Sequence, residues 1–244
     1  MTGHKSCLVT KLSHYVELSP RDHDLLTAFE AEQREYRKRD LVRREGDEVK
    51  YLFVVKKGWF YGHSLLPSGK RQVHRLYLPG DLIGTQEVVC KTATVNVSAA
   101  SKGILCPFEK AGLKTVFVES PRLTALLYSI EALDQVTQDD RLRSIARMDA
   151  AGRLAHFFLQ VFSRLSVAGE QQGDTLKVEM SQELIGDALG LTGIHVNRTF
   201  RQLSEDGLIS LDNGSLTLRD REALKSIAAF DDRHYRIDTS WFPG

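Results

Sequence analysis

The sequence predicts an α+β protein: an N-terminal antiparallel β-roll, a long middle helix and a C-terminal winged helix-turn-helix. Three observations predict it. Short β-type runs alternate with glycine-bearing turns from Glu35 to Phe108, a long helical pattern without glycine runs from Ser120 to Ala151, and two short amphipathic helices precede an Asn213-Gly214 hairpin signal. The expected divisions are 1–118 for the β-roll with an N-terminal helix, 119–147 for the long helix, 148–230 for the winged helix-turn-helix and 231–244 for a tail.

The composition is that of an ordinary globular protein. The 244 residues are 42% hydrophobic and 27% charged, with a net charge of +1, so any field that attracts nucleic acid must be local. The sequence contains no run of about 18 apolar residues, so no membrane span is predicted. The first residues lack the pattern of an export signal. The three cysteines, Cys7, Cys90 and Cys106, have no paired spacing, which is typical of a reducing compartment. We therefore expect a cytoplasmic protein.

The β-roll and the helix before it are predicted from local signals. Ser19-Pro20 is a helix start, and apolar residues at helical spacing follow it to about Gln33. The β-type runs are YLFVV, WFYGHSLL, VHRLYL, TVNVSAA and ILCPF, separated by turns such as KKGW and PSGKR. Several short strands at 8–12-residue spacing predict an antiparallel sandwich or roll.

The long helix has two apolar blocks separated by a polar segment, Gln135 to Asp140, that only Val136 interrupts. A helix of about 25 residues spans about 38 Å, which is too long for one small β-roll to cover. We expect a second subunit to cover it in coiled-coil fashion, which makes it a dimerisation helix. The alternative is a helix that lies across its own domain. The apolar positions that predict the packing are Leu123, Leu127, Ile130, Leu133, Leu142 and Ile145.

The last domain begins where the helical pattern restarts, at Met148 to Gly152. A polar loop, Ser166–Thr175, precedes a short helix whose apolar residues lie on one face, and Gly190 supplies the tight turn that follows. Two alternating runs then flank Asn213-Gly214, which predicts a β-hairpin. Helix, turn, helix and hairpin together predict a winged helix.

The second helix of the pair has a polar face opposite its apolar one. Val196, Phe200 and Leu203 are spaced to face the core, and Thr192 is a good N-cap. A helix fits the major groove of DNA, where arginine pairs with guanine and asparagine with adenine. Arg198 and Asn197 are therefore candidates for base contacts. The candidate DNA-binding residues are Thr192, Gly193, Ile194, His195, Asn197, Arg198 and Arg201, with Thr192, His195 and Arg201 assigned to phosphates.

The chain resembles transcription regulators of the Crp/Fnr superfamily from about Ser19 to Phe230. The run LPGDLIG and the turns at Gly46, Gly58, Gly69 and Gly80 are similar to its cyclic-nucleotide-binding-like β-roll, and LIGDALGLTGIHVNRTFRQLSEDGLISL to its DNA-binding signature. The resemblance implies a β-roll sensor domain, a homodimer on a two-fold symmetric operator in double-stranded DNA, and contact with RNA polymerase, often through the loop equivalent to Ser166–Thr175.

The family's base-reading positions fall on Gly193, Ile194, Asn197 and Arg198. Arg198 agrees with the family pattern, whereas many relatives place polar residues at the positions of Gly193 and Ile194. An isoleucine suits contact with a thymine methyl group. The operator is therefore expected to differ from the best-known consensus.

The resemblance also bears on the small molecule that the β-roll senses. Relatives that bind cyclic AMP hold its ribose and phosphate with a glutamate and an Arg-Ser pair, and these positions are Thr85, Thr94 and Val95 here. Burying a phosphate without the guanidinium would forfeit a charge-assisted pair, so we do not expect cyclic AMP. The effector is unidentified, and the region proposed for it comprises Gly84, Thr85, Gln86, Thr94, Val95, Gln138 and Asp139.

The cysteines and histidines of the sequence also bear on cofactors other than cyclic AMP. An iron–sulfur cluster needs four thiolates and the chain has three cysteines, so none is expected. Haem is not excluded, with His14, His63, His74 and His156 as the candidate ligands of its iron. No other metal site and no catalytic arrangement is predicted, so the chain is not expected to be an enzyme. The alternative function is a β-roll module that binds a ligand and regulates a protein partner through the helix pair.

Overall fold

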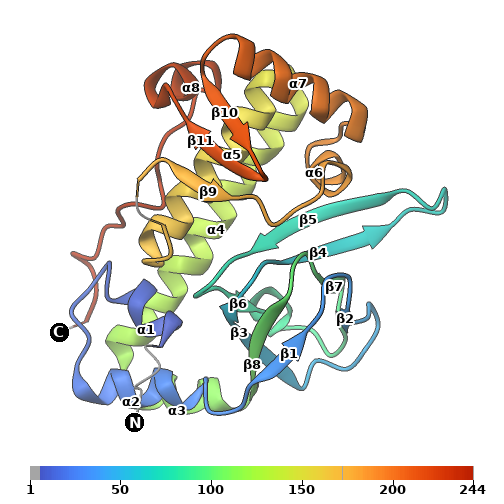
Figure 1. The fold of residues 1–244 in the computed structure, drawn as a ribbon. Coiled ribbons are helices and arrows are strands. Elements are labelled where there is room, and N and C mark those ends of the chain that lie inside the picture. Colours follow the sequence, from blue (N-terminus) through green and yellow to red (C-terminus); the bar gives the residue numbers. More distant parts are fainter. Residues whose placement is uncertain (1–5, 172, 244) are drawn as a thin grey trace. The chain divides into compact units, whose positions relative to one another are not determined.

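The computed structural model describes residues 6–171 and 173–243 (Figure 1). The start of the predicted first domain, Met1–Lys5, and Gln172 of the polar loop lie outside the described residues, as does Gly244. The described chain packs as two compact units. Unit 1 contains the residues up to Ser64, His74–Ala132 and those from Ile237 onward, and unit 2 contains Leu65–Val73 and Leu133–Arg236.

Unit 1 begins with two short helices, α1 (Cys7–Leu12) and α2 (Pro20–Ala28). The predicted Ser-Pro start of α2 is confirmed: the Ser19 hydroxyl accepts a hydrogen bond from the Asp22 amide at 3.1 Å, and the Asp22 carboxylate accepts from the Ser19 amide at 2.9 Å. This reciprocal cap satisfies two backbone donors at the helix start. Helix α2 ends at Ala28 rather than near Gln33. Helix α1 was not predicted from the sequence.

The β-roll consists of two four-stranded sheets whose neighbouring strands are antiparallel, as predicted. Side chains from both sheets, including Phe53, Phe60, Val97 and Leu105, form a buried core. The first sheet has the order β1 (Arg34–Tyr36), β8 (Gly103–Glu109), β3 (Tyr51–Lys57), β6 (Leu82–Ile83), and the second β2 (Leu41–Arg43), β7 (Asn96–Ala99), β4 (Phe60–Leu65), β5 (Arg71–Tyr77). A single 3₁₀ turn, η1 (Thr85–Glu87), follows β6.

Two helices follow the β-roll: α3 (Gly112–Glu119), which was not predicted, and α4 (Pro121–Arg147), the predicted long helix. Leu123 and Leu127 of α4 are buried in the core of unit 1, and Ile130 packs against that core. The expectation that a second subunit covers these positions is therefore wrong, because the helix has two apolar sides and this one packs on its own domain. The exposed apolar residues of α4 are instead Tyr128, Val136 and Leu142.

In unit 2, helix α5 (Ala150–Val167) contacts α7 (Gly193–Glu205) and α8 (Arg221–Ile227). Helix α7 also contacts α6 (Gln182–Leu189) and strand β10 (Ile209–Asp212) (Figure 1). The Asp149 side chain caps α5 by accepting from the Gly152 amide at 2.8 Å. The other elements are the strands β9 (Thr175–Lys177) and β11 (Ser215–Leu218).

Among the described residues, no helix combines the length and the apolar character that crossing a bilayer would require.

Candidate nucleic-acid interface and effector region

Helices α6 and α7 form the predicted helix-turn-helix. The Ser181 hydroxyl caps α6 by accepting from the Leu184 amide at 3.2 Å. Gly190 ends α6 with φ of +68°, a conformation that glycine adopts without steric cost, as predicted from the sequence. The turn therefore forms where the sequence places it.

Gly186, inside α6, fixes the spacing of the two helices, and sequence reasoning missed it. A Cβ built at this position would lie 2.5 Å from the Leu191 carbonyl oxygen, so no other residue fits without movement. Glycine costs about 1 kcal/mol relative to alanine inside a helix, so its presence there is the signal that could have revealed a close backbone contact.

Helix α7 has the two faces that its sequence predicts. The Thr192 hydroxyl accepts from the His195 amide at 3.2 Å, which confirms the N-cap. Val196, Phe200 and Leu203 are buried, which confirms the core face. A side chain thus caps the N-terminal turn of the helix, and the buried apolar side chains hold its opposite face in the core.

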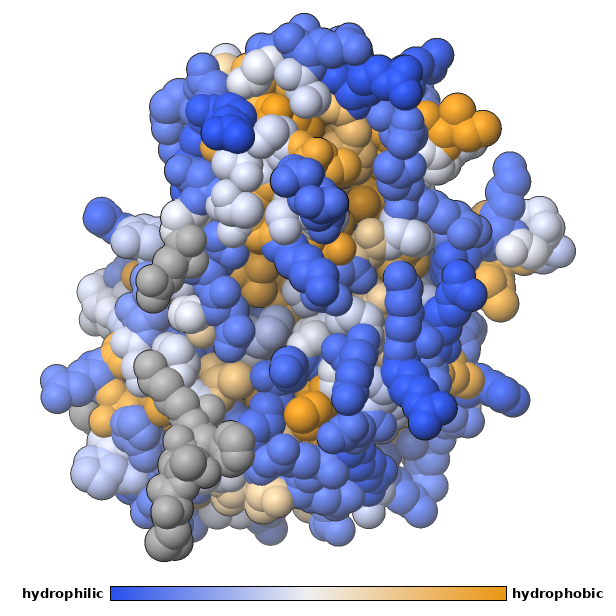
Figure 2. All heavy atoms as spheres, in the orientation of Figure 1, coloured by the Kyte–Doolittle hydropathy of each residue, from blue (hydrophilic) through white to orange (hydrophobic). Residues whose placement is uncertain are grey.

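The predicted DNA-binding residues lie on this one helix and its cap. Ile194, Asn197, Arg198 and Arg201 are exposed together with Thr192, and Gly193 and His195 are partly exposed. Figure 2 shows a largely hydrophilic surface over α7. This arrangement places amide and guanidinium groups on the solvent side of a short, rigid helix, where a duplex can reach them.

Asn197 has a partner that the sequence did not reveal. Its side-chain nitrogen donates to the side-chain oxygen of the partly exposed Gln182 at 3.1 Å. The bond orients the Asn197 amide and leaves its oxygen free of this contact. Gln182 is therefore a residue that positions the interface from the first turn of α6.

Two arginines hold the C-terminal end of α6. Arg141 of α4 donates to the Ala188 carbonyl at 2.7 Å, and Arg153 of α5 donates to the Leu189 carbonyl at 3.2 Å. Cations near the end of a helix interact favourably with its last carbonyl groups. Burial lowers the pKa of Arg141 to about 10, which still leaves it charged at neutral pH. Neither arginine was singled out from the sequence.

The hairpin that follows α7 confirms the prediction from Asn213-Gly214. Both residues have positive φ, +47° and +78°, as a two-residue hairpin turn of this type requires. Strand β9 adds a third strand on the β11 side, with Leu176 opposite Leu216. The helix pair and this small sheet form the winged helix.

In unit 1, the predicted effector region contains a buried ion pair rather than an open phosphate site. The Glu87 carboxylate pairs with the Arg43 guanidinium, and both side chains are buried. The same carboxylate accepts from the Thr94 amide at 2.6 Å and from the Thr94 hydroxyl at 2.9 Å. A backbone amide, a hydroxyl and a guanidinium thus surround an anion that the chain itself supplies.

The other predicted effector residues are distributed over both units. Gly84 precedes η1 with φ of +97°, and the buried Thr85 hydroxyl has no hydrogen-bond partner. Gln86 is exposed and Val95 is partly buried. Gln138 and Asp139 lie on the part of α4 that belongs to unit 2. Arg43, on a strand that the sequence did not predict, is the residue that sequence reasoning missed.

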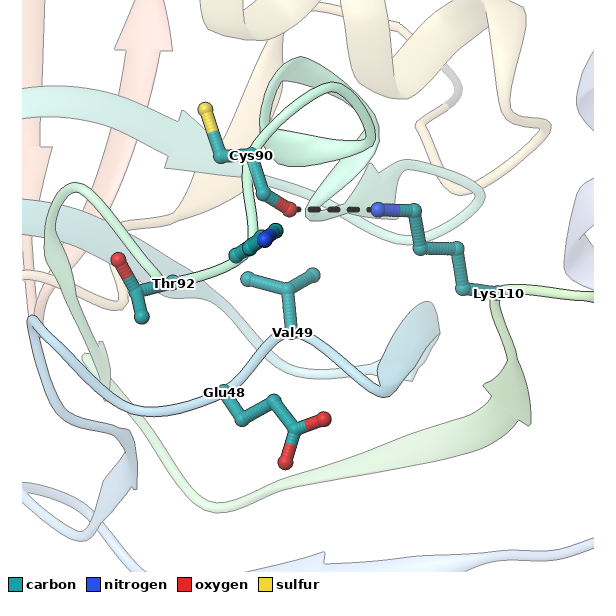
Figure 3. Close-up of a pocket in the computed structure, with 6 residues that line it drawn as sticks. Glu48, Val49, Cys90, Thr92 and Lys110 are labelled. Carbon is teal, nitrogen blue, oxygen red and sulfur yellow. Dashed lines mark hydrogen bonds between the residues drawn. The ribbon is translucent and has the colours of Figure 1, made fainter.

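A separate open cavity of 470 Å³ in unit 1 contains none of the predicted effector residues (Figure 3). Its lining residues are Glu48, Val49, Cys90, Lys91, Thr92 and Lys110. The Lys110 ammonium donates to the Cys90 carbonyl at 3.3 Å, and the Cys90 sulfur points away from that ammonium in Figure 3. The Lys110 ammonium therefore does not pair with the thiol.

Cys106 and His156 lie in surroundings that disfavour their charged forms. Burial raises the pKa of the Cys106 thiol to about 11, which opposes thiolate formation at neutral pH. Burial also lowers the pKa of His156, whose ring packs against Phe230. No group of three or more histidine, cysteine or acidic side chains is placed to hold a metal in the described part of the chain.

The fold and the face of α7 define a DNA-binding protein of the helix-turn-helix class, and comparison with known proteins makes this specific. The Crp-like helix-turn-helix domain matches residues 152–227, and the cyclic nucleotide-binding domain matches residues 33–120. The first match contains the helix-turn-helix and its hairpin, and the second contains all eight strands of the β-roll.

Known relatives give the same result over most of the chain. The nitrogen fixation regulation protein FixK of Bradyrhizobium diazoefficiens is 30% identical over 192 residues, 78% of this chain and 79% of its own. The transcriptional activator protein Anr of Pseudomonas aeruginosa is 25% identical over 92% of this chain and 91% of its own. The structure of FixK2 from Bradyrhizobium japonicum shares the fold, with a TM-score of 0.73 and 24% identity over 82% of this chain and 98% of that one.

The chain belongs to the Crp/Fnr family of transcription regulators. It is a transcription regulator with a DNA-binding helix-turn-helix.

Proposed function

We propose that the chain acts as a homodimer on a two-fold symmetric operator, with α7 of each subunit in the major groove. Successive grooves on one side of a duplex are about 34 Å apart, so two copies of α7 would read two half-sites one turn apart. The observation that carries the proposal is the exposed face of α7, where Asn197 and Arg198 lie above the buried Val196 and Phe200.

The roles of the side chains follow from their chemistry. Arg198 offers a planar guanidinium for the two acceptors of a guanine edge, and Asn197 offers its amide to adenine. Thr192, His195 and Arg201 would contact phosphates, which fix the position of the helix without reading sequence. Gly193 completes the face by letting the backbone approach the duplex.

Each part of the chain has one role in this proposal. Residues 1–118 would sense the signal, 119–147 would form the dimer, 148–230 would bind DNA and 231–244 would form a tail. RNA polymerase would contact the Ser166–Thr175 loop, of which Gln172 lies outside the described residues. This assignment and a cytoplasmic location come from the family resemblance.

The signal that gates the protein is proposed to differ from cyclic AMP. In the β-roll, the Thr94 amide and hydroxyl already bind the Glu87 carboxylate, and Arg43 neutralises that carboxylate. A second anion at this place would have to displace a buried ion pair. A clear rise in melting temperature on adding micromolar cyclic AMP would contradict this part of the proposal.

The test of DNA recognition is selection from random duplexes followed by titration of the selected sequence. The wild-type protein is expected to enrich an inverted repeat. Arg198→Ala is expected to weaken binding by about 1–3 kcal/mol and to relax the preference at one base position in each half-site. Arg236→Ala is the matched control, because it removes the same charge from an exposed position outside α7.

Two results would contradict the proposal. Unchanged affinity and unchanged selected sequence in Arg198→Ala would show that this residue does not read a base. Selection of no sequence by the wild-type protein would favour the alternative in which the helix pair docks a protein.

A further inference from the structure

Ile194 is the most exposed large hydrophobic side chain in the described part of unit 2. It is 85% exposed, against 66% for Leu142, and it lies in the first turn of α7. Because the side chain contributes almost nothing to the core, the fold itself gives no reason for an isoleucine at this position.

The neighbours of Ile194 are polar and belong to the proposed DNA face. Asn197 and Arg198 follow at the third and fourth positions, so they share its side of the helix, and both are exposed. An isolated aliphatic group among amide and guanidinium groups faces whatever those groups face. In a helix-turn-helix protein, the groups on this face of the second helix face the major groove of DNA.

Gly193 leaves space beside this side chain. A Cβ built at Gly193 would meet the Glu183 backbone only at 3.5 Å, which is ordinary contact, and the residue has helical geometry. Packing therefore does not require glycine here, in contrast to Gly186. The missing side chain lets the first turn of α7 approach a surface closely, with Ile194 as the group that reaches it.

The major groove offers one apolar group on a base edge, the C5-methyl group of thymine. An isoleucine cannot donate or accept a hydrogen bond, so it can select among bases only through this methyl group. We propose that Ile194 reads a thymine methyl in each half-site, close to the base that Arg198 contacts. The inference rests on the proposed mode of DNA binding and adds the base class that this position selects.

The test replaces each thymine of one selected half-site, one at a time, with deoxyuridine. This substitution removes the methyl group and leaves base pairing unchanged. At one position the wild-type protein is expected to lose about fourfold in affinity, which is the effect of one buried methyl group. Ile194→Ala is expected to bind the thymine and uracil duplexes equally at that position.

Two controls separate this effect from damage to the protein. Ile194→Ala should keep the wild-type melting temperature, because the side chain is exposed. Ile227→Ala truncates an exposed isoleucine on α8, 43% exposed, and should keep the full uracil penalty.

The outcomes distinguish the inference from the proposed function. If the wild-type protein binds its selected operator while Ile194→Ala shows the same loss of affinity as the wild type at every uracil position, Ile194 does not read thymine. In that case the proposed DNA binding still stands. If the wild-type protein selects no sequence, both the inference and the proposed operator are wrong.

Discussion

At the scale of single residues, the pairing of buried charges in the β-roll is the main feature that local sequence did not reveal. Glu87 and Arg43 are 44 positions apart and meet only because β2 and the segment after β6 fold onto one another. Two further Arg43 nitrogens, Nε and one terminal nitrogen, have no hydrogen-bond partner. Removing the carboxylate would leave a guanidinium buried without its counter-charge, which is far more costly than losing an exposed pair.

We therefore expect Glu87→Gln to lower the free energy of unfolding by about 3–5 kcal/mol. Adding Arg43→Met should restore part of this loss, because the introduced amide oxygen still accepts from Thr94 and no charge is left buried. Glu48→Gln, which breaks an exposed pair with Lys50, should change stability by less than about 0.5 kcal/mol. Urea unfolding of the four proteins measures this, and equal losses in Glu87→Gln and Glu48→Gln would refute it.

At the scale of elements, the helix pair depends on two glycines with different roles. Gly186 lies against the Leu191 carbonyl, whereas a Cβ at Gly193 would have ordinary contacts. The helix period of the sequence predicts α6 and α7 and their buried faces, but it treats both glycines alike. Only the packing of the turn against α6 separates them.

This difference gives a prediction with its own internal control. Gly186→Ala should destabilise the protein by about 1–3 kcal/mol, because the added methyl group overlaps a backbone oxygen. Gly193→Ala should leave stability unchanged or raise it by up to about 1 kcal/mol through helix propensity. Chemical unfolding compares the two variants. If both behave alike, the close approach at Gly186 is not what holds the turn.

Helix α4 shows the same limit on sequence reasoning. Its length agrees with the prediction and it begins at Pro121, two residues after the expected boundary, but the apolar stripe with Leu123 and Leu127 packs on its own unit. The positions left exposed include Tyr128 and Leu142, two heptads apart. Periodicity identifies an apolar stripe, and it does not say which partner covers it.

At the scale of the whole molecule, a homodimer would bury this second stripe of α4. Leu142→Asp is expected to convert a dimer into a monomer, because two carboxylates would meet near the two-fold axis in an apolar contact. Val118→Asp, an equally drastic change at a 71% exposed position on α3, should leave the dimer intact. Light scattering on the two variants decides this, and the loss of affinity for an inverted repeat should accompany the monomer. A wild-type protein that is monomeric at all concentrations would overturn the dimer.

The sequence by itself determined the α+β class, the order of β-roll, long helix and winged helix, and the two faces of α7. These features depend on residue periodicity, capping residues and turn chemistry, all of which act over a few positions. Tertiary structure alone decided that Arg43 meets Glu87, that Gln182 holds Asn197, and which side of α4 is covered. These depend on contacts between distant segments, and such contacts form only when the chain has folded.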